Sequence, residues 1–183
     1  MKKTKSAKNT AICRDILRYG GDILLSDTFQ QAAGETHHLH GSVADHTLNV
    51  CIISVWLSRK LENRNIRIGK KDLVQAALCH DLGMVSRDKK YRSRKDAWRS
   101  HAKESVLVAY TLIPDMNSSV EDMILTHMWP VTGPHPRSRE GMLLGTADKI
   151  ASLTDWVSWL TGRPFELNIK NELKKKNPLL LKP

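Results

Sequence analysis

Apolar residues recur every three or four positions along most of this 183-residue chain. This spacing places them on one face of a helix, as is typical of helices that pack against a shared core. The pattern predicts helices over residues 12–25, 27–33, 45–63, 72–80, 101–112, 119–128 and 139–160. Because no segment alternates apolar and polar residues as a half-buried strand does, we expect an all-α fold, a single-domain helical bundle.

Glycine, proline and small polar residues mark the expected helix ends. Gly20-Gly21 is expected to interrupt the first helix, and Pro130 to end the helix over 119–128. The expected N-terminal caps are Asp45, Asp72, Ser100 and Ser119. Residues 86–99 are polar and basic, and we expect a long loop or insertion there, of the kind that often serves as a lid.

The same spacing predicts which side chains face the core. In the helix over 101–112, Val106, Leu107 and Tyr110 are expected to point inward. In the helix over 45–63, the expected inner residues are Leu48, Cys51, Ile52, Val55 and Trp56. In the helix over 139–160, the expected apolar side consists of Met142, Leu143, Thr146, Ile150, Leu153 and Val157.

Composition and cysteine content favour a soluble protein of a reducing compartment. Hydrophobic residues make up 40% of the chain, and no apolar run approaches the ~20 residues needed to span a bilayer. The charged start, Met1–Lys5, is followed by polar residues, so we expect no secretory signal. The three cysteines form no Cys-x-x-Cys pair and are expected to be small buried residues of a cytoplasmic protein.

The formal net charge of +10 predicts anionic partners such as nucleotides, nucleic acid or phosphates. Basic residues cluster over 87–95, directly after a His-Asp pair, and over 174–176 near the end of the chain. Such runs are most often solvated surface. The run over 87–95 is the stronger candidate for a functional role, because it follows the His-Asp pair in the sequence.

Histidine and aspartate residues occur at intervals that suit a metal site. His80-Asp81 ends the apolar helix over 72–80, and His46 stands near the start of the helix over 45–63. His101, His127 and Asp148 follow, each within a predicted helix. Imidazole and carboxylate groups are ligands of divalent metals in hydrolytic sites, and only a bundle could bring six residues from separate helices together.

The order His46, His80-Asp81, Asp148 resembles the HD superfamily of metal-dependent phosphohydrolases, and the local sequences around these residues agree. The additional His101 and His127 resemble the subset with two further histidines. Within it, Leu125–Pro130 followed by Ala147-Asp-Lys looks most like bacterial HD hydrolases of unassigned substrate. The resemblance implies an HD-type helical bundle. It divides the compact domain into an N-terminal helical extension (1–35), an HD core (36–163) and a basic C-terminal tail (164–183), which could be a loose helix or disordered.

The resemblance also implies the ligands. His46, His80, Asp81 and Asp148 would hold a first divalent metal, and His101 and His127 would complete a second site, with Asp81 bridging the two. His101 and His127 could instead bind substrate phosphate. One or two ions are therefore expected, of Mn, Fe, Co, Ni or Zn. The family's Gly-Tyr-Pro signature for cyclic dinucleotides is absent from the sequence.

Other residues are candidates for catalysis or substrate binding. His80, Asp81 and Lys149 are the expected catalytic residues, and Lys149 is placed there because it adjoins Asp148. The candidates for substrate binding are His40, Arg87, Arg94, Arg137 and Arg139. His37, His38 and His135 are expected outside the metal shell.

The most favoured function is hydrolysis of a phosphoester or phosphoanhydride of a nucleotide or other small anionic molecule by metal-bound hydroxide. One alternative is an HD-fold di-iron oxygenase, because the same ligands serve both chemistries. The other is a non-catalytic module for nucleic acid, which the basic charge would allow although no known nucleic-acid motif is present. The oligomeric state stays open.

Overall fold

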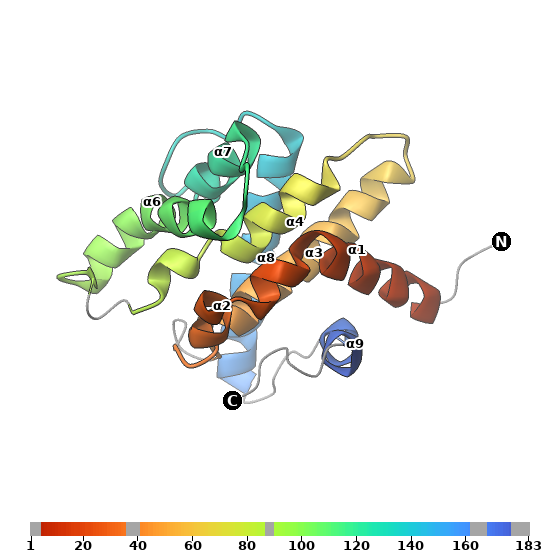
Figure 1. Ribbon diagram of the computed structural model, residues 1–183, viewed down its shortest axis with the longest axis horizontal. Coiled ribbons are helices and arrows are strands. Elements are labelled where there is room, and N and C mark those ends of the chain that lie inside the picture. The colour runs from red at the N-terminus through yellow and green to blue at the C-terminus, as the bar shows by residue number, and fades with distance from the viewer. Residues whose placement is uncertain (1–4, 36–40, 87–89, 162–167, 177–183) are drawn as a thin grey trace.

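The computed structural model describes residues 5–35, 41–86, 90–161 and 168–176. All regular elements in these ranges are helices, so the predicted all-α class is confirmed (Figure 1). They are α1 (Lys5–Leu25), α2 (Asp27–Ala32), α3 (Val43–Glu62), α4 (Lys70–Cys79), the 3₁₀ helix η1 (Leu82–Met84), α6 (Arg94–Leu112), α7 (Ser118–Thr126), α8 (Arg139–Thr161) and α9 (Asn168–Lys176). In the described part of the chain, no helix has the length and apolar character needed to cross a membrane.

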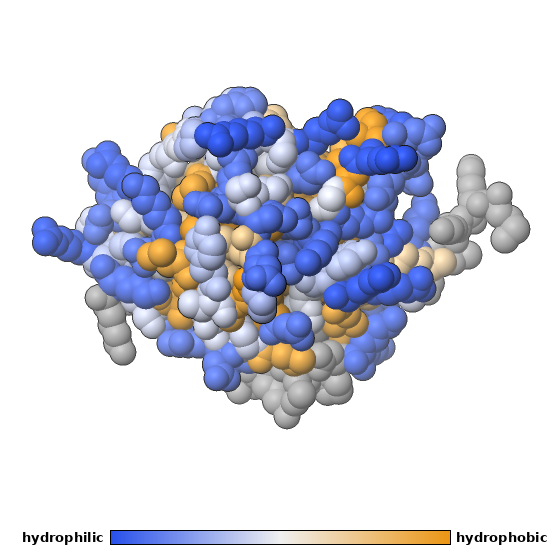
Figure 2. Space-filling model, turned by 45° about the horizontal axis from the view of Figure 1, so that its top comes forward, coloured by the Kyte–Doolittle hydropathy of each residue, from blue (hydrophilic) through white to orange (hydrophobic). Residues whose placement is uncertain are grey.

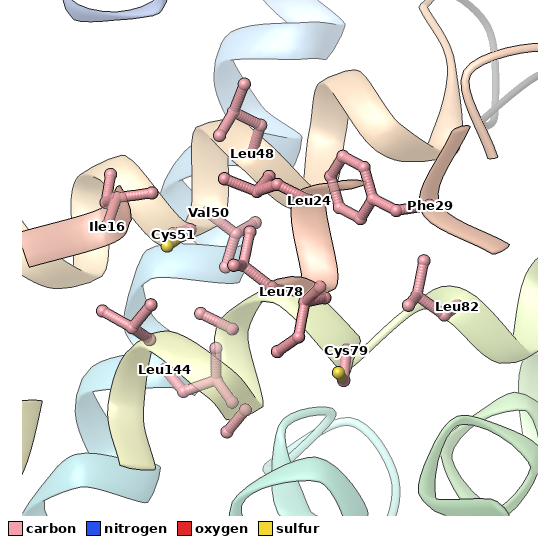
Figure 3. Packing of buried hydrophobic residues seen from close by; sticks show 14 of the residues in the cluster. Ile16, Leu24, Phe29, Leu48, Val50, Cys51, Leu78, Cys79, Leu82 and Leu144 are labelled. Carbon is pink, nitrogen blue, oxygen red and sulfur yellow. The ribbon is translucent and has the colours of Figure 1, made fainter. Parts of the chain in front are cut away.

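The core forms where α3 and α4 pack on each other and on α1 and α8 (Figure 3). Ile16 and Leu24 of α1, Leu48 of α3, and Leu78 of α4 are fully buried in it. Leu144 of α8 is buried there too. The three cysteines, Cys13, Cys51 and Cys79, are buried and unpaired, as expected of small core residues. This packing places the start of α3 and the end of α4 beside α8.

Helices α3, α4 and α7 begin within three residues of the predicted cap, but each has a different residue at that position. Ser42 caps α3 by accepting a hydrogen bond from the Asp45 N–H, and Asn117 caps α7. Gly69 precedes α4 without a side-chain cap. The predicted caps, Asp45, Asp72 and Ser119, lie instead inside the first turns. Asp45 and Asp72 are also favourable there, because an acidic side chain in the first turn lies near the unpaired N–H groups of the helix start. The sequence therefore predicted the first turn of each helix but not the capping residue.

The predicted loop over 86–99 is wrong in its second half. Helix α6 begins at Arg94, and its cap is Ser93, not Ser100. The Ser93 hydroxyl accepts a hydrogen bond from the Asp96 N–H, while the Asp96 carboxylate accepts one from the Arg92 N–H. The first turns of α6 project from the bundle and bury few residues, so they carry no apolar period that a pattern could detect.

Gly20-Gly21 does not interrupt the first helix, since α1 runs without a break from Lys5 to Leu25. Gly20 faces α4, where a Cβ atom would lie 2.2 Å from Leu78 Cδ1 and 3.0 Å from Val74 Cγ1. A Cβ at Gly21 would contact nothing within 4 Å. Glycine at position 20 therefore permits close approach of two helices and does not end one.

The predicted inner faces of α6 and α8 need correction. Val106 is buried, but Leu107 and Tyr110 are exposed. On the predicted apolar side of α8, Leu143 is partly buried against the core, but Met142, Ile150, Leu153 and Val157 are exposed. The buried side of α8 consists of Gly141, Leu144, Gly145, Ala147, Asp148 and Ala151.

Small residues on this side let α8 lie close against its neighbours, as at Gly145, where a Cβ atom would lie 3.1 Å from the His127 carbonyl oxygen at the end of α7. Trp56 of α3, also predicted to face inward, is 43% exposed, and Lys60 lies 3.8 Å above its ring. Figure 2 shows hydrophobic residues in separate patches on a mostly hydrophilic surface.

The C-terminal tail contains a helix, α9, that packs on α1 and α3. Ile169 and Leu173 are buried, and Lys170 forms an ion pair with Asp45. Glu172 accepts a hydrogen bond from Asn9. Of the two expectations for this tail, the helix is the one found over 168–176, while 164–167 and 177–183 lie outside the described residues.

Candidate metal centre

The histidines and aspartates singled out in the sequence converge on one place from separate elements. His46 lies in the first turn of α3, His80 at the end of α4, and Asp81 directly before η1. The other three are His101 of α6, His127 at the end of α7, and Asp148 of α8. Each is at most 7% exposed. Buried polar groups need partners, so such a cluster demands an explanation.

His46, His80 and Asp148 form the first half of the cluster. His46 Nε2 lies 3.1 Å from Asp148 Oδ1, and His80 Nε2 lies 3.9 Å from the same oxygen. Their ligand atoms lie within 4.8 Å of one another, a spacing that a single metal ion could bridge. Asp81 Oδ2 completes this half, at 3.5 Å from His80 Nε2 and 3.8 Å from His46 Nε2.

His101 and His127 form the second half around the other oxygen of Asp81. Asp81 Oδ1 lies 3.3 Å from His101 Nε2 and 3.6 Å from His127 Nε2. The two Nε2 atoms are 3.1 Å apart. Asp81 therefore stands between the halves with one oxygen toward each, the arrangement required of a bridging carboxylate.

Main-chain carbonyl groups fix the tautomers of three of these histidines. The Nδ1 atom of His80 lies 2.9 Å from the Ala77 carbonyl oxygen, and that of His127 lies 2.7 Å from the carbonyl of Ile124. The Nδ1 atom of His101 lies 3.1 Å from the Trp98 carbonyl oxygen. A carbonyl only accepts, so each Nδ1 carries the proton and each Nε2 turns a lone pair toward the cluster.

This donor set fits a cation. The buried Nε2 of His80 has no hydrogen-bond partner among the described residues. The lone pairs of His101 and His127 face each other across 3.1 Å, which is repulsive unless a cation or a proton lies between them. Imidazole nitrogen combined with carboxylate oxygen suits Mn, Fe, Co, Ni or Zn.

Asp155, which the sequence analysis missed, supports His46 from behind. Its Oδ2 lies 2.9 Å from His46 Nδ1, on the side of the ring away from the cluster. A carboxylate in this position orients an imidazole ligand and raises its basicity. The detectable signal is its spacing, because Asp155 follows Asp148 by seven residues and so lies on the same face of α8.

Carboxylates and burial act in opposite directions on the pKa values of the cluster. Burial alone would lower the pKa of His46, but hydrogen bonds with Asp148 and Asp155 outweigh it and raise the pKa from 6.5 to about 10. Burial would raise the pKa of Asp148, yet His46 and the nearby histidines lower it to about 2. Burial and the neighbouring His80 lower the pKa of His127 to about 4, so its Nε2 is free of a proton at neutral pH.

Gly83 allows the two halves to approach each other. A Cβ atom at this position would lie 2.4 Å from the His101 carbonyl oxygen and 2.6 Å from the Ser105 nitrogen. The Gly83 N–H donates a hydrogen bond to the Ser105 hydroxyl, at 2.9 Å. The backbone of η1 is thus held against α6, which brings Asp81 to His101.

A cavity of about 220 Å³ opens over the cluster. Its lining includes five of the six residues of the cluster, all but His80. The other lining residues are Met84, Trp98, Met128, Val131, Lys149 and Ser152. The Lys149 ammonium donates hydrogen bonds to the carbonyl oxygens of His127 and Gly145, at 3.0 and 3.2 Å, and lies 3.9 Å from Asp148 Oδ2.

None of the remaining candidates whose side chains the structure describes lines this cavity. Arg137 is exposed and pairs with Asp122, and Arg139 is an exposed residue at the start of α8. Arg94 begins α6. His135 lies against the Trp129 ring, with centroids 4.7 Å apart. The other candidates lie outside the described residues: His37, His38, His40 and Arg87.

Comparison with models of protein families finds the HD domain over residues 43–159. This span begins with α3, ends within α8 and contains all six residues of the cluster. No curated protein and no solved structure matches the chain.

Proposed function

The chain belongs to the HD-domain family, and we propose that it is a metal-dependent phosphohydrolase acting on a nucleotide or another small phosphorylated molecule. Most members of the family have metal-dependent phosphohydrolase activity. The observation that carries the proposal is Asp81, whose two oxygens face two separate groups of imidazole nitrogens beneath an open cavity. A centre that only stabilised the fold would have no need of such a cavity.

The ligands divide between two ions. His46, His80 and Asp148 would hold one with Asp81 Oδ2, and His101 and His127 would hold the other with Asp81 Oδ1. A divalent metal bound there supplies Lewis acidity, which activates water and polarises a phosphoryl oxygen. His80 and Asp81 take part in catalysis through this role.

Lys149 is the proposed electrostatic residue of the site. Its ammonium borders the cavity and is held by two main-chain carbonyls, so its position does not depend on substrate. A fixed positive charge offsets the charge of phosphate oxygens in the transition state. The net charge of +10 attracts such substrates over a longer range.

The size of the cavity supports a small substrate over nucleic acid. Its volume of about 220 Å³ is below the range usual for drug-sized ligands. A phosphoryl group with a modest substituent can enter it, whereas a nucleic-acid strand would have to reach the ligands with only its terminal nucleotide.

Metal content and phosphate release together test the proposal. The wild type, His80→Ala/Asp81→Ala and the control His135→Ala are loaded with Mn²⁺, desalted and analysed for metal. Phosphate release is then measured with nucleoside monophosphates, phenyl phosphate and glycerol phosphate. We expect about two ions per chain and phosphate release in the wild type and the control, and neither in the double variant.

Other outcomes would change the assignment. No bound metal after loading, or bound metal without phosphate release from any of these esters, would overturn the hydrolase. Iron retained from expression, with oxygen uptake in place of phosphate release, would identify an oxygenase. One ion per chain would leave the hydrolase in place and assign His101 and His127 to substrate phosphate.

A further inference from the structure

The cavity over the metal centre has an apolar side. Met84, Trp98, Met128 and Val131 line it together with the ligands. Each is close in sequence to a ligand of the second half: Met84 follows Asp81 by three residues, Trp98 precedes His101 by three, and Met128 and Val131 follow His127. Trp98 is 37% exposed and Val131 is 62% exposed, so part of this apolar surface is open to solvent.

The other lining residues that the structure describes, apart from the ligands, are polar and carry little positive charge. They are Lys149 and Ser152 of α8. Lys149 is the one cationic side chain among the described lining residues, apart from the histidines. Two of the three N–H groups of its ammonium already donate to main-chain carbonyls, which leaves one for a ligand.

This division points to the shape of the substrate. A phosphoryl group must lie at the ligands, since that is where its charge is offset. Whatever the phosphoryl group is attached to then lies against Trp98 and its apolar neighbours. A sugar would find few hydrogen-bond partners for its hydroxyl groups among the apolar residues of the described lining, and a polyphosphate would bring additional charge beside the one ammonium of that lining.

Building on the proposed phosphohydrolase activity, we propose that the substrate is a phosphomonoester whose alcohol carries a flat apolar group, which stacks on Trp98. In the reaction, the oxygen of water forms a bond to phosphorus and the bond between phosphorus and the ester oxygen breaks. The ester oxygen leaves with the electron pair of that bond and receives one of the two protons of water. The products are the apolar alcohol and inorganic phosphate, and no oxidant or other reactant is required.

Binding of two phosphonates tests the apolar wall without any turnover, because their carbon–phosphorus bond is not hydrolysed. Phenylphosphonate and methylphosphonate are titrated into Mn²⁺-loaded protein by calorimetry. We expect phenylphosphonate to bind about tenfold tighter or more. Trp98→Ala should remove most of this preference and leave methylphosphonate within about twofold, whereas Trp98→Phe should keep it.

Trp56→Ala is the matched control, because Trp56 is a similarly exposed tryptophan on α3 that does not line this cavity. The Trp56→Ala variant should prefer phenylphosphonate over methylphosphonate as strongly as the wild type does. Equal affinity of the wild type for both phosphonates, or an unchanged preference in Trp98→Ala, would overturn the inference. Metal content of each variant shows that the ligands are intact.

Hydrolysis then separates failure of this inference from failure of the proposed function. Phenyl phosphate should be cleaved with a kcat/KM at least about tenfold above that of glycerol phosphate. Equal rates for the two esters would keep the hydrolase and overturn the apolar substrate. No release of phosphate from these two esters or from the nucleoside monophosphates would overturn the hydrolase itself, whatever the phosphonates show.

Discussion

Asp155 is a residue whose effect on the metal affinity of the centre can be measured directly. It contacts His46 at 2.9 Å from the side of the ring opposite the cluster. Since it is not itself a proposed ligand, its removal weakens the orientation of one imidazole without removing a donor atom. The closest variant, Asp155→Asn, keeps the shape and loses the negative charge.

We expect Asp155→Asn to lower the affinity for metal by about 10- to 100-fold. The carboxylate is 28% exposed, so the variant should fold normally. Titration of metal-free protein with Mn²⁺ measures the affinity, and circular dichroism measures the fold. Asp22→Asn, an exposed carboxylate on α1, is the control and should bind as the wild type does. An affinity equal to that of the control would show that Asp155 does not position His46.

At this scale the sequence predicts what is local. The His80-Asp81 pair ends a helix, so both side chains must lie near one another, and the motif alone predicts this. The support of His46 by Asp155 depends on how α3 lies against α8, which no pattern within either helix specifies. The arginine candidates were chosen for their charge and, over 87–95, for their place after the His80-Asp81 pair, and neither property says which way a surface residue points.

Among the elements, α1 offers an internal comparison between neighbouring glycines. Gly20 lies against Leu78 and Val74 of α4, and Gly21 faces open space. Both occupy the interior of one helix, where glycine is intrinsically less favourable than alanine. Only their surroundings differ.

Alanine at the two positions should therefore change stability in opposite directions. Gly21→Ala should raise the free energy of unfolding by about 0.5–1 kcal/mol through helix propensity. Gly20→Ala should lower it by about 1–3 kcal/mol, because the new methyl group forces buried side chains of α4 to move. Urea denaturation of both variants measures the two changes. A stabilising Gly20→Ala would mean that α1 does not pack on α4 as described.

The error over α8 has the same physical origin as the error over Gly20-Gly21. Large apolar residues such as Leu153 and Val157 were expected to be buried, yet the buried side of α8 consists mostly of glycine and alanine, and Gly145 lies against the end of α7 at His127. Small residues add little to an apolar period, although they decide how closely two helices can approach. The existence of α8 was therefore predictable from the sequence, whereas its packed face was not; on α3, which packs through large residues, the predicted Leu48, Cys51, Ile52 and Val55 are buried.

At the scale of the whole molecule, α9 connects the end of the chain to the start of α3. Within α9, Leu173 is fully buried, and Lys170 forms an ion pair with Asp45, the residue before His46. The C-terminal tail is basic and was set apart from the metal-binding core in the sequence, but this helix belongs to the packing around α1 and α3.

Leu173→Ala should lower the free energy of unfolding by about 2–5 kcal/mol, the usual cost of a cavity at a buried leucine. Lys175→Ala, at an exposed position of the same helix, should change it by less than about 0.5 kcal/mol. Chemical denaturation of both variants measures the difference. Similar small effects at both positions would show that α9 is not docked in solution.

The metal centre joins more of the molecule than any single helix contact does. Its six residues come from α3, α6, α7, α8 and the junction of α4 with η1, which are far apart in the chain. In the unfolded chain these residues are dispersed, so a metal ion held by them would bind the folded protein and stabilise it. At a metal concentration of about 100 times Kd, the stabilisation is about 2.7 kcal/mol.

For a chain of this length, that stabilisation should raise Tm by roughly 5–11 °C. Thermal unfolding of the wild type with Mn²⁺ and with excess chelator measures the shift. The variant His80→Ala/Asp81→Ala should show the same Tm under both conditions, because it lacks ligands of both halves. A wild type that is equally stable with and without metal would mean that the six residues do not act together as a binding site. Their close approach would then have to be maintained by helix packing alone, against the repulsion of the facing imidazole lone pairs.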